Sequence, residues 1–261
     1  IEGSKLIKYG ADTDGQTVQK KDLYDELQRE IDTGIVTDVA GDFLEEIVIP
    51  DGIKKIGDYC FYQCRKLHTI SLGPGVIEFG SDVFMNCGVL HTVIIRSSVS
   101  KKNSLRQIVT YRTQETDVWF DDAAIQFPEV HESYELIGPA HIFELNVEGQ
   151  GIRARQCFEG DIFRFDLYDR VFAHAINTED EHVLCRMAAF RLKFPLSIRD
   201  EYKSAYENYL TKHIDVLCDE MIARKDLSII SDLLEQGMLK EEQTDIVLTK
   251  LSQAGWLQGT T

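Results

Sequence analysis

The sequence lacks most of the features that mark disulfide-rich secreted domains, membrane proteins and disordered chains. It has only six cysteines and five prolines in 261 residues, and six cysteines are too few for a disulfide framework in a chain of this length. No apolar run approaches the roughly 18–20 residues of a membrane span, and no Asn-x-Ser/Thr glycosylation site occurs. Hydrophobic residues make up 43% of the chain, which favours globular structure in one or two domains.

Basic residues are also scarce, since the formal net charge is -16. Residues 1–120 carry 14 Lys and Arg against 18 Asp and Glu, whereas residues 121–261 carry 14 against 26. An acidic surface repels nucleic acids and anionic membranes, so we expect neither as a partner. Residues 1–5 show no signal-peptide pattern. The expectation is a cytoplasmic protein, with a secreted or cell-surface location open if a leader has been trimmed.

Motifs for catalysis are missing as well. The sequence contains no phosphate-binding or dinucleotide-binding glycine motif, no H-E-x-x-H and no G-x-S-x-G. Cys64 and His68 lie four residues apart, as do Cys87 and His91, and Cys60 is nearby. Such a set could bind zinc, but the repeat described next accounts for the spacing by itself, and His68 and His91 follow the first leucine of their units and should point outward. We therefore predict no enzyme, no metal and no cofactor, and keep a metal-dependent hydrolase as the weakest alternative.

The strongest positive signal is a repeat of 23 residues. The segments LEEIVI, LHTISL and LHTVII begin at Leu44, Leu67 and Leu90, and the match continues downstream in the first two units. The matched pairs are Gly52 and Gly75, Ile53 and Val76, Ile56 and Phe79, Gly57 and Gly80, Phe61 and Phe84, and Cys64 and Cys87. Each unit predicts a short strand, a turn at glycine, apolar residues that form the wall opposite the strand, and an aromatic residue that points inward. One unit cannot bury its own apolar edge, so the units must stack.

The stretch from Ile49 to Cys64 resembles the bacterial leucine-rich repeat of the BspA type, whose pattern is roughly L-x-x-I-x-I-P-x-x-V-x-x-I-G-x-x-A-F-x-x-C. The resemblance covers residues 44 to about 99. It departs from the pattern at Cys60 and Val83, where the family has alanine, and at Pro74, which has slipped by one position. It ends where Lys102 replaces an apolar residue. The resemblance implies a strand-and-turn solenoid that binds proteins or other ligands.

The flanking sequence completes the predicted architecture, an α+β chain of a short solenoid followed by an all-helical domain of stacked helical hairpins. We assign residues 1–118 to the solenoid. Its atypical N-terminal cap has an edge strand at residues 5–9 and a helix from Leu23 to Ile31 that Gly34 ends. Residues 119–150 are predicted to be a docking linker with at most one strand. Residues 96–114, with five basic residues and no acidic one, form a solvated connector or an anion-binding patch.

Residues 151–261 are predicted to form the helical domain. Thr178-x-x-Glu181 has the form of a capping box before a helix that Pro195 ends, and Ser197-x-x-Asp200 opens the next helix. Two further helices end at Gly237 and Gly255. Tyr202, Tyr206 and Tyr209 lie along one face of the helix that Ser197-x-x-Asp200 opens. We interpret this tyrosine stripe as a helix-packing surface. This half resembles the helical tail that follows such repeats in some proteins of gut bacteria, a weaker likeness that implies no activity.

The predicted function is non-catalytic protein–protein interaction, as a scaffold module of a bacterial cell. A secreted or surface-exposed adhesin that contacts a host is the alternative. The outward side chains of the stacked strands form ladders that a partner protein could contact. The alternative interpretation is that this face is plain solvated sheet or is covered by the N-terminal segment. The predicted binding residues are Glu46, His68, Thr69, Ser71, His91, Thr92 and Ile94, with Glu45 and Val48 in the same ladders.

Overall fold

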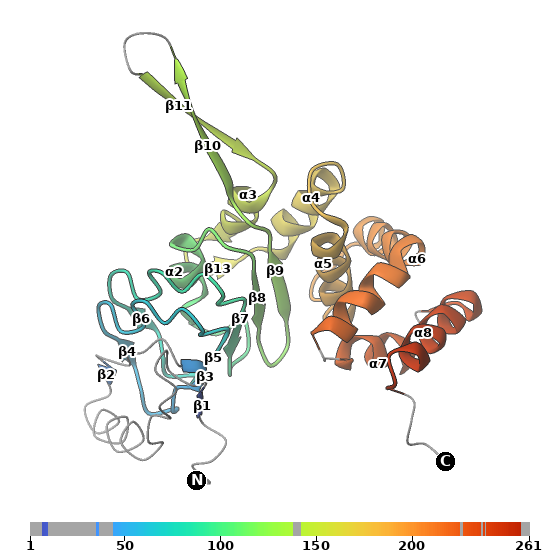
Figure 1. Ribbon diagram of the computed structural model, residues 1–261, viewed down its shortest axis with the longest axis horizontal. Helices are drawn as coiled ribbons and strands as arrows, with labels where there is room; N and C mark the ends of the chain where they lie inside the picture. The colour runs from blue at the N-terminus through green and yellow to red at the C-terminus, as the bar shows by residue number, and fades with distance from the viewer. Residues whose placement is uncertain are drawn as a thin grey trace.

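The computed structural model describes residues 7–9, 35–36, 44–137, 142–224, 227–235, 237 and 239–256. A β-solenoid of about three turns spans residues 46–119 and is followed by a mostly helical region. Figure 1 shows the two parts beside each other, with one β-hairpin extending away from the body. The predicted fold class is therefore confirmed.

The repeats form two walls. The first is a six-stranded sheet in the order β1-β3-β5-β7-β8-β9, and the second is a three-stranded sheet in the order β2-β4-β6. The repeat strands pair in parallel in both walls. Their bounds are Leu44–Val48 for β3, Lys55–Ile56 for β4, Thr69–Leu72 for β5, Glu78–Phe79 for β6 and Thr92–Ile95 for β7.

The stacking of one unit on the next follows the predicted register. Thr69 is paired with Glu46 in β3 and with Thr92 in β7. Leu44, Leu67 and Leu90 are each fully buried between the walls, as successive turns of a solenoid require. Farther along each unit, Phe61 and Phe84 stack with ring centroids 5.7 Å apart and an interplanar angle of 8°. The apolar rungs are the core of this half.

The backbone repeats as faithfully as the side chains. Tyr59 and Gln63 adopt positive φ of 55° and 60°, and Asp82 and Asn86 do so 23 residues later, with φ of 51° and 64°. Each unit thus makes the same left-handed turns. Gly80 is required by close approach, because a Cβ there would lie 2.5 Å from the backbone nitrogen of Asp58 in the preceding unit.

At the N-terminal end, two described strands continue the walls. Strand β1, Ile7–Tyr9, pairs antiparallel with β3 and forms one edge of the six-stranded sheet. This confirms an edge strand there. Strand β2, Ile35–Val36, pairs parallel with β4. The predicted helix from Leu23 to Ile31 lies outside the described residues.

A short helix ends the second wall. Helix α2, Leu105–Thr110, packs beside β6, and Gln107 replaces the next strand's hydrogen bonds. Its Oε1 accepts from Phe79 N at 2.9 Å, and its Nε2 donates to Ile77 O at 3.0 Å. The connector at residues 96–114 is thus partly helical.

The chain then returns to the first wall and continues as more strand than we predicted. Strand β8, Thr116–Trp119, pairs parallel with β7, and β9, Ala124–Phe127, pairs antiparallel with β8. Strands β10, His131–Ile137, and β11, Ile142–Glu148, form the projecting hairpin. The expectation of at most one strand in residues 119–150 is wrong. The pairing of β8, β9 and the hairpin depends on backbone register, which the apolar pattern of this segment does not show.

The helical half packs α5 against α6, and α8 against α6. A small pair of strands, β12 and β13, precedes α4. The bounds are Gly151–Arg155 for α3, Phe158–Glu159 for β12, Ile162–Phe163 for β13, Phe165–Ala175 for α4, Glu181–Lys193 for α5, Asp200–Ala223 for α6, Ser228–Glu235 for α7 and Glu241–Gln253 for α8. None of the described helices is long and apolar enough to cross a bilayer.

Two predicted caps differ from the observed ones. Asp180, and not Thr178, caps α5 by accepting a hydrogen bond from His182 N at 2.9 Å. The motif Ser197-x-x-Asp200 predicts Ser197 as the N-cap of the next helix, but α6 begins at Asp200 with Arg199 as its N-cap, and Ser197 has a positive φ of 51°. Gly237 and Gly255 adopt positive φ just beyond α7 and α8, as expected of glycines that end helices. Tyr206 is fully buried and packs on Phe172, in agreement with the predicted packing role of the tyrosine stripe.

Candidate binding face

The outward side chains of β3, β5 and β7 stand in register. Glu46, Thr69 and Thr92 form one ladder. Val48, Ser71 and Ile94 form the next. The backbone bonds from His68 N to Glu45 O and from His91 N to His68 O extend this register by one residue. The three predicted ladders are therefore present, and we call their outward surface the ladder face.

Two histidines stack on one another along this face. The rings of His68 and His91 are 5.6 Å apart with an interplanar angle of 10°. Each ring is fixed by the threonine that follows it, since Nδ1 lies 3.0 Å from Thr69 Oγ1 in the first and 2.9 Å from Thr92 Oγ1 in the second. Glu46 Oε1 lies 3.7 Å from His68 Nε2. Burial lowers the pKa of His91, and the neighbouring His68 lowers it further.

One of the ladders is occupied from within the chain. Arg96 donates to Ser71 Oγ at 2.7 Å, to Ile49 O at 2.7 Å and to Asp51 Oδ1 at 2.6 Å. Ser71 is consequently buried. Its ladder is bridged by the chain itself, which leaves the ladder of Glu46 and the threonines as the more open one.

The helical half forms the opposite wall of a pocket over this open ladder. The pocket has a volume of about 580 Å³. On the solenoid side it contains five of the predicted residues, and Ser71 and Ile94 are not among those lining it. The solenoid side consists of Glu46, His68, Thr69, Val89, His91, Thr92, Asp117 and Trp119, and the helical side of Phe190, Met221, Ala223, Arg224 and Ile229.

Strand β8 supplies two pocket residues that the sequence reasoning missed. Asp117 is paired with Thr92, so it continues the threonine ladder as a fourth step. Trp119 packs against Phe190 of α5 with ring centroids 4.7 Å apart. The step from Thr92 to Asp117 is 25 residues, whereas the repeat is 23, because the segment containing α2 lengthens this unit. A search for the 23-residue repeat that allowed an insertion of two residues in this unit would have found strand β8.

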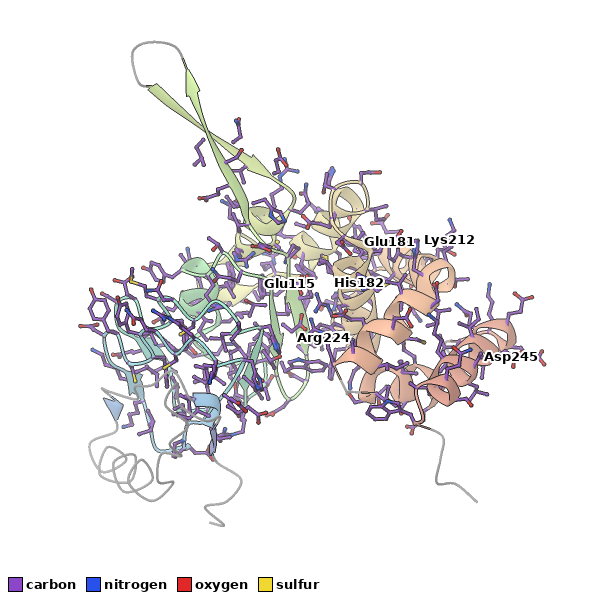
Figure 2. All side chains as sticks on the ribbon, in the orientation of Figure 1. Glu115, Glu181, His182, Lys212, Arg224 and Asp245 are labelled. Atoms are coloured by element: carbon purple, nitrogen blue, oxygen red, sulfur yellow. The ribbon has the colours of Figure 1, made fainter. Side chains whose placement is uncertain are left out.

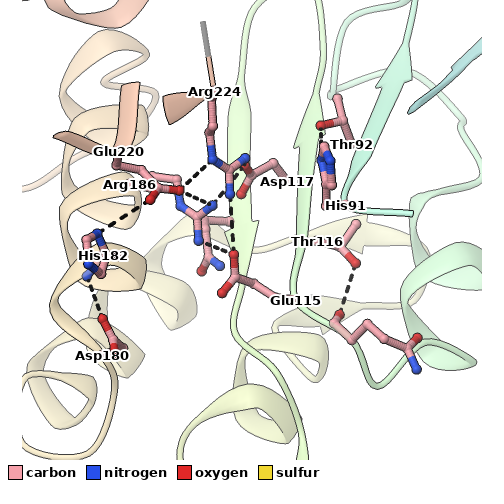
Figure 3. A network of polar contacts seen from close by, with 12 residues as sticks. His91, Thr92, Glu115, Thr116, Asp117, Asp180, His182, Arg186, Glu220 and Arg224 are labelled. Carbon is pink, nitrogen blue, oxygen red and sulfur yellow. Dashed lines mark hydrogen bonds and ion pairs between the residues drawn. The ribbon is translucent and has the colours of Figure 1, made fainter. Parts of the chain in front are cut away.

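Charged side chains join β8 to the helices beside the pocket. Figure 2 shows Glu115 beside the sheet, with His182 and Arg224 facing it from the side of the helices α5 and α6. In Figure 3 the contacts converge on two arginines. Arg186, 1% exposed, pairs with Glu115 and lies 3.5 Å from Asp117 Oδ2 and 3.2 Å from Glu220 Oε1.

Arg224 completes this network. Its Nη1 lies 2.7 Å from Asp117 Oδ2, its Nε 2.5 Å from Glu220 Oε1 and its Nη2 3.6 Å from Glu115 Oε1. Among the described residues, three carboxylates therefore share two guanidinium groups, and one negative charge is left over. Asp117 lies on β8, Glu115 directly precedes that strand and Glu220 lies on α6, whereas the guanidinium groups come from α5 and the end of α6. The network therefore fixes the helices against the solenoid.

Burial opposes both charges at the centre of the network. It raises the pKa of Asp117, while Arg186 acts in the opposite direction. For Arg186 burial is opposed by Asp117, Glu115 and Glu220, which together raise its pKa. Asp117 Oδ1 and Arg186 Nε are buried without a hydrogen-bond partner in the described part of the chain. An acceptor of this kind, in a residue that lines a pocket, is a position where a ligand's donor would be satisfied.

The cysteines and histidines of the repeats lie on different sides of the wall. Cys64 and Cys87 are buried in the core, whereas His68 and His91 lie on the ladder face. All six cysteines are buried, and none of them forms a disulfide. Burial raises the pKa of Cys157 and of Cys185 to about 12, which keeps these thiols protonated. Within the described ranges, no three His, Cys, Asp or Glu side chains gather as metal ligands would.

The basic segment at residues 96–114 is largely engaged within the protein. Arg96 bridges Ser71 and Asp51, Arg106 pairs with Asp161 at 3.7 Å, and Arg112 is buried and donates to Leu90 O. Only Lys101 and Lys102 of the five lie exposed without such a contact in the structure as described. The segment thus serves mainly to hold the end of the solenoid.

Comparison with protein families assigns the repeats. Residues 40–106 match the family model described as "BspA type Leucine rich repeat region (6 copies)". No curated protein and no solved structure matches the chain. Repeats of this family are protein-interaction or adhesion-type modules and are generally non-catalytic. The described part of this match, residues 44–106, coincides with the stacked turns of the structure, and residues 40–106 are therefore a BspA-type leucine-rich repeat region.

Proposed function

We propose that this protein is a non-catalytic recognition or scaffold module that binds a protein partner in the pocket between the ladder face and the helical half. The observation that carries the proposal is the pocket itself. Its solenoid wall consists of side chains repeated on parallel strands, and its opposite wall is held in place by the network around Arg186. Binding surfaces are commonly such fixed concavities, with aromatic residues and a few oriented polar groups.

The composition of the pocket fits a protein ligand. Trp119, Phe190 and Met221 supply the kind of apolar contact that is enriched at protein interfaces. His68, His91 and the two threonines supply donors and acceptors whose positions are fixed by their mutual hydrogen bonds. Because these rings and hydroxyls are already oriented, a partner would lose little further entropy of the pocket on binding.

The cell compartment is part of the proposal. Six buried cysteines that form no disulfide are compatible with a reducing cytoplasm. A secreted adhesin is the competing assignment, and fractionation of the native cell with an antibody against this chain separates the two. Recovery in the soluble cytoplasmic fraction supports the proposal, and recovery at the cell surface or in the medium supports the adhesin.

The binding proposal is tested by blocking the ladder. Replacing Thr69 and Thr92 by arginine fills the pocket from the solenoid side. The matched control introduces arginine at Glu78 and Met85 instead, two exposed residues of the repeats that do not line the pocket. We expect native-lysate partners to be retained by the control and lost by the ladder variant, with both variants showing unchanged circular dichroism. Equal retention by both variants would place binding on another surface.

A further inference from the structure

The charge and shape of the pocket identify the side chain that it receives. We infer that the pocket binds an arginine side chain of the protein partner, whose guanidinium group enters between the ladder face and α5. This inference rests on the proposed function and names the chemistry of the partner. It is carried by three observations: an unsatisfied acceptor, an excess of negative charge and a set of flat rings.

The acceptor is Asp117. Its side chain is 4% exposed and lines the pocket. Oδ2 contacts both arginines of the network, whereas Oδ1 has no hydrogen-bond partner among the residues that the structure describes. A buried carboxylate oxygen without a donor is costly. A guanidinium carries five N–H donors in a planar fork that matches carboxylate geometry, so a small shift of Asp117 toward the pocket would give Oδ1 its missing donor.

The charge balance favours a cation. The charged groups that line the pocket are Glu46, Asp117 and Arg224, two carboxylates and one guanidinium. The network behind them adds Glu115 and Glu220 against Arg186, and Arg112 adds one more positive charge that acts on His91. Four carboxylates thus face three guanidiniums. The lowered pKa of His91 keeps that ring uncharged near neutral pH, so it does not cancel the excess.

The rings favour a planar cation over a compact one. Trp119 on the solenoid side meets Phe190 of the helical wall, and the stacked imidazoles of His68 and His91 also form part of the solenoid wall. A guanidinium stacks on such faces and is weakly hydrated, whereas an ammonium group is strongly hydrated and does not stack. Lys193, whose Nζ lies 5.5 Å from the Trp119 ring centroid, shows that this indole already accepts a cation on one side.

The two tryptophans of the chain make a direct test possible. Trp119 lines the pocket, and Trp256 lies beyond α8, 43% exposed. The full chain, labelled with ¹⁵N in its indoles, is titrated with a blocked Gly-Arg-Gly tripeptide and with the same peptide carrying neutral citrulline. We expect a saturable shift of Trp119 and none of Trp256, with the arginine peptide binding about fivefold more tightly than the citrulline peptide.

Matched variants locate the charge. Glu46→Gln is expected to weaken binding of the arginine peptide roughly threefold. Glu78→Gln, in β6 on the other wall, is expected to leave the affinity for this peptide unchanged. Equal binding of the citrulline peptide, equal effects of the two variants, or no shift of Trp119 would overturn the inference. The proposed function is judged separately by partner retention in the Thr69 and Thr92 variant. If the Thr69 and Thr92 variant loses the partner but the pocket shows no preference for the arginine peptide over the citrulline peptide, the proposed function stands and only the inference of a bound guanidinium is refuted.

Discussion

The two halves of this protein are stabilised in different ways. The solenoid buries repeated apolar rungs such as Leu44, Leu67 and Leu90, and each turn contacts chiefly its neighbours. The helical half buries charge: Arg191, fully buried, holds Asp169 through Nε at 2.7 Å and Nη2 at 3.0 Å, and Tyr206 donates to the same carboxylate at 2.8 Å. Stability in the solenoid is therefore distributed over many similar contacts, whereas in the helices it is concentrated in a few specific ones.

The strongest test of this contrast is to remove Asp169. Asp169→Ala leaves Arg191 charged and buried without its carboxylate and deprives Tyr206 of its acceptor. We expect a loss of about 3–5 kcal/mol in the free energy of unfolding, the usual cost of breaking a buried pair. Urea denaturation followed by circular dichroism measures it.

A double variant provides the control for this prediction. Asp169→Leu with Arg191→Met replaces the pair by apolar side chains of similar size, which is often neutral or stabilising. It should be more stable than Asp169→Ala alone. Hydrogen exchange should show that Asp169→Ala loosens α4, α5 and α6 and leaves β3, β5 and β7 protected. Equal loosening of the strands would contradict the separation of the two halves.

The corresponding change in the solenoid is Leu67→Ala. Leu67 is fully buried in the middle rung, so its truncation should cost about 2–5 kcal/mol through lost apolar burial and a cavity. Hydrogen exchange should now increase in β3, β5 and β7 first, since each turn depends on its neighbours. Arg65→Ala, an exposed change two residues earlier, serves as the control and should have no measurable effect in the same denaturation experiment.

A smaller effect is expected from the pH dependence of His91. Its folded pKa lies below that of the unfolded chain, so the unfolded state binds more protons in the interval between them. The stability that His91 contributes is complete above about pH 6.5 and is lost as the pH falls through that value to the folded pKa. His91→Gln should flatten the stability curve over this range. An unchanged slope would show that the ring is not desolvated.

The smallest effect concerns the thiols, which also differ between the halves. In the solenoid, a hydrogen bond from Cys64 lowers the pKa of Cys87. In the helical half, burial raises the pKa of Cys185 to about 12 and that of Cys218 to about 11. Since the thiolate is the reactive form, Cys87 should be alkylated by iodoacetamide before these two at pH 8. Peptide mapping by mass spectrometry gives the order, and the reverse order would refute the assignment.

The contrast also explains what could be predicted from the sequence. A 23-residue period places Leu44, Leu67 and Leu90 in register, and with them the ladder of Glu46, Thr69 and Thr92, because a stack of similar units has one good alignment. Asp117 escaped prediction because its unit is two residues longer. Its partners Arg186 and Arg224 lie about 70 and 110 residues farther along, and nothing local to an arginine in a helix says which distant carboxylate it will meet.

The most direct test of the binding face is site-specific photo-cross-linking. A benzoylphenylalanine placed at Thr92 lies in the pocket, and one placed at Met85 lies on an exposed turn of the preceding repeat. In native extract, the account predicts that position 92 yields a covalent adduct with a discrete protein and that position 85 does not. An adduct from position 85 alone, or equal adducts from both, would contradict the claim that the pocket is where this protein binds its partner.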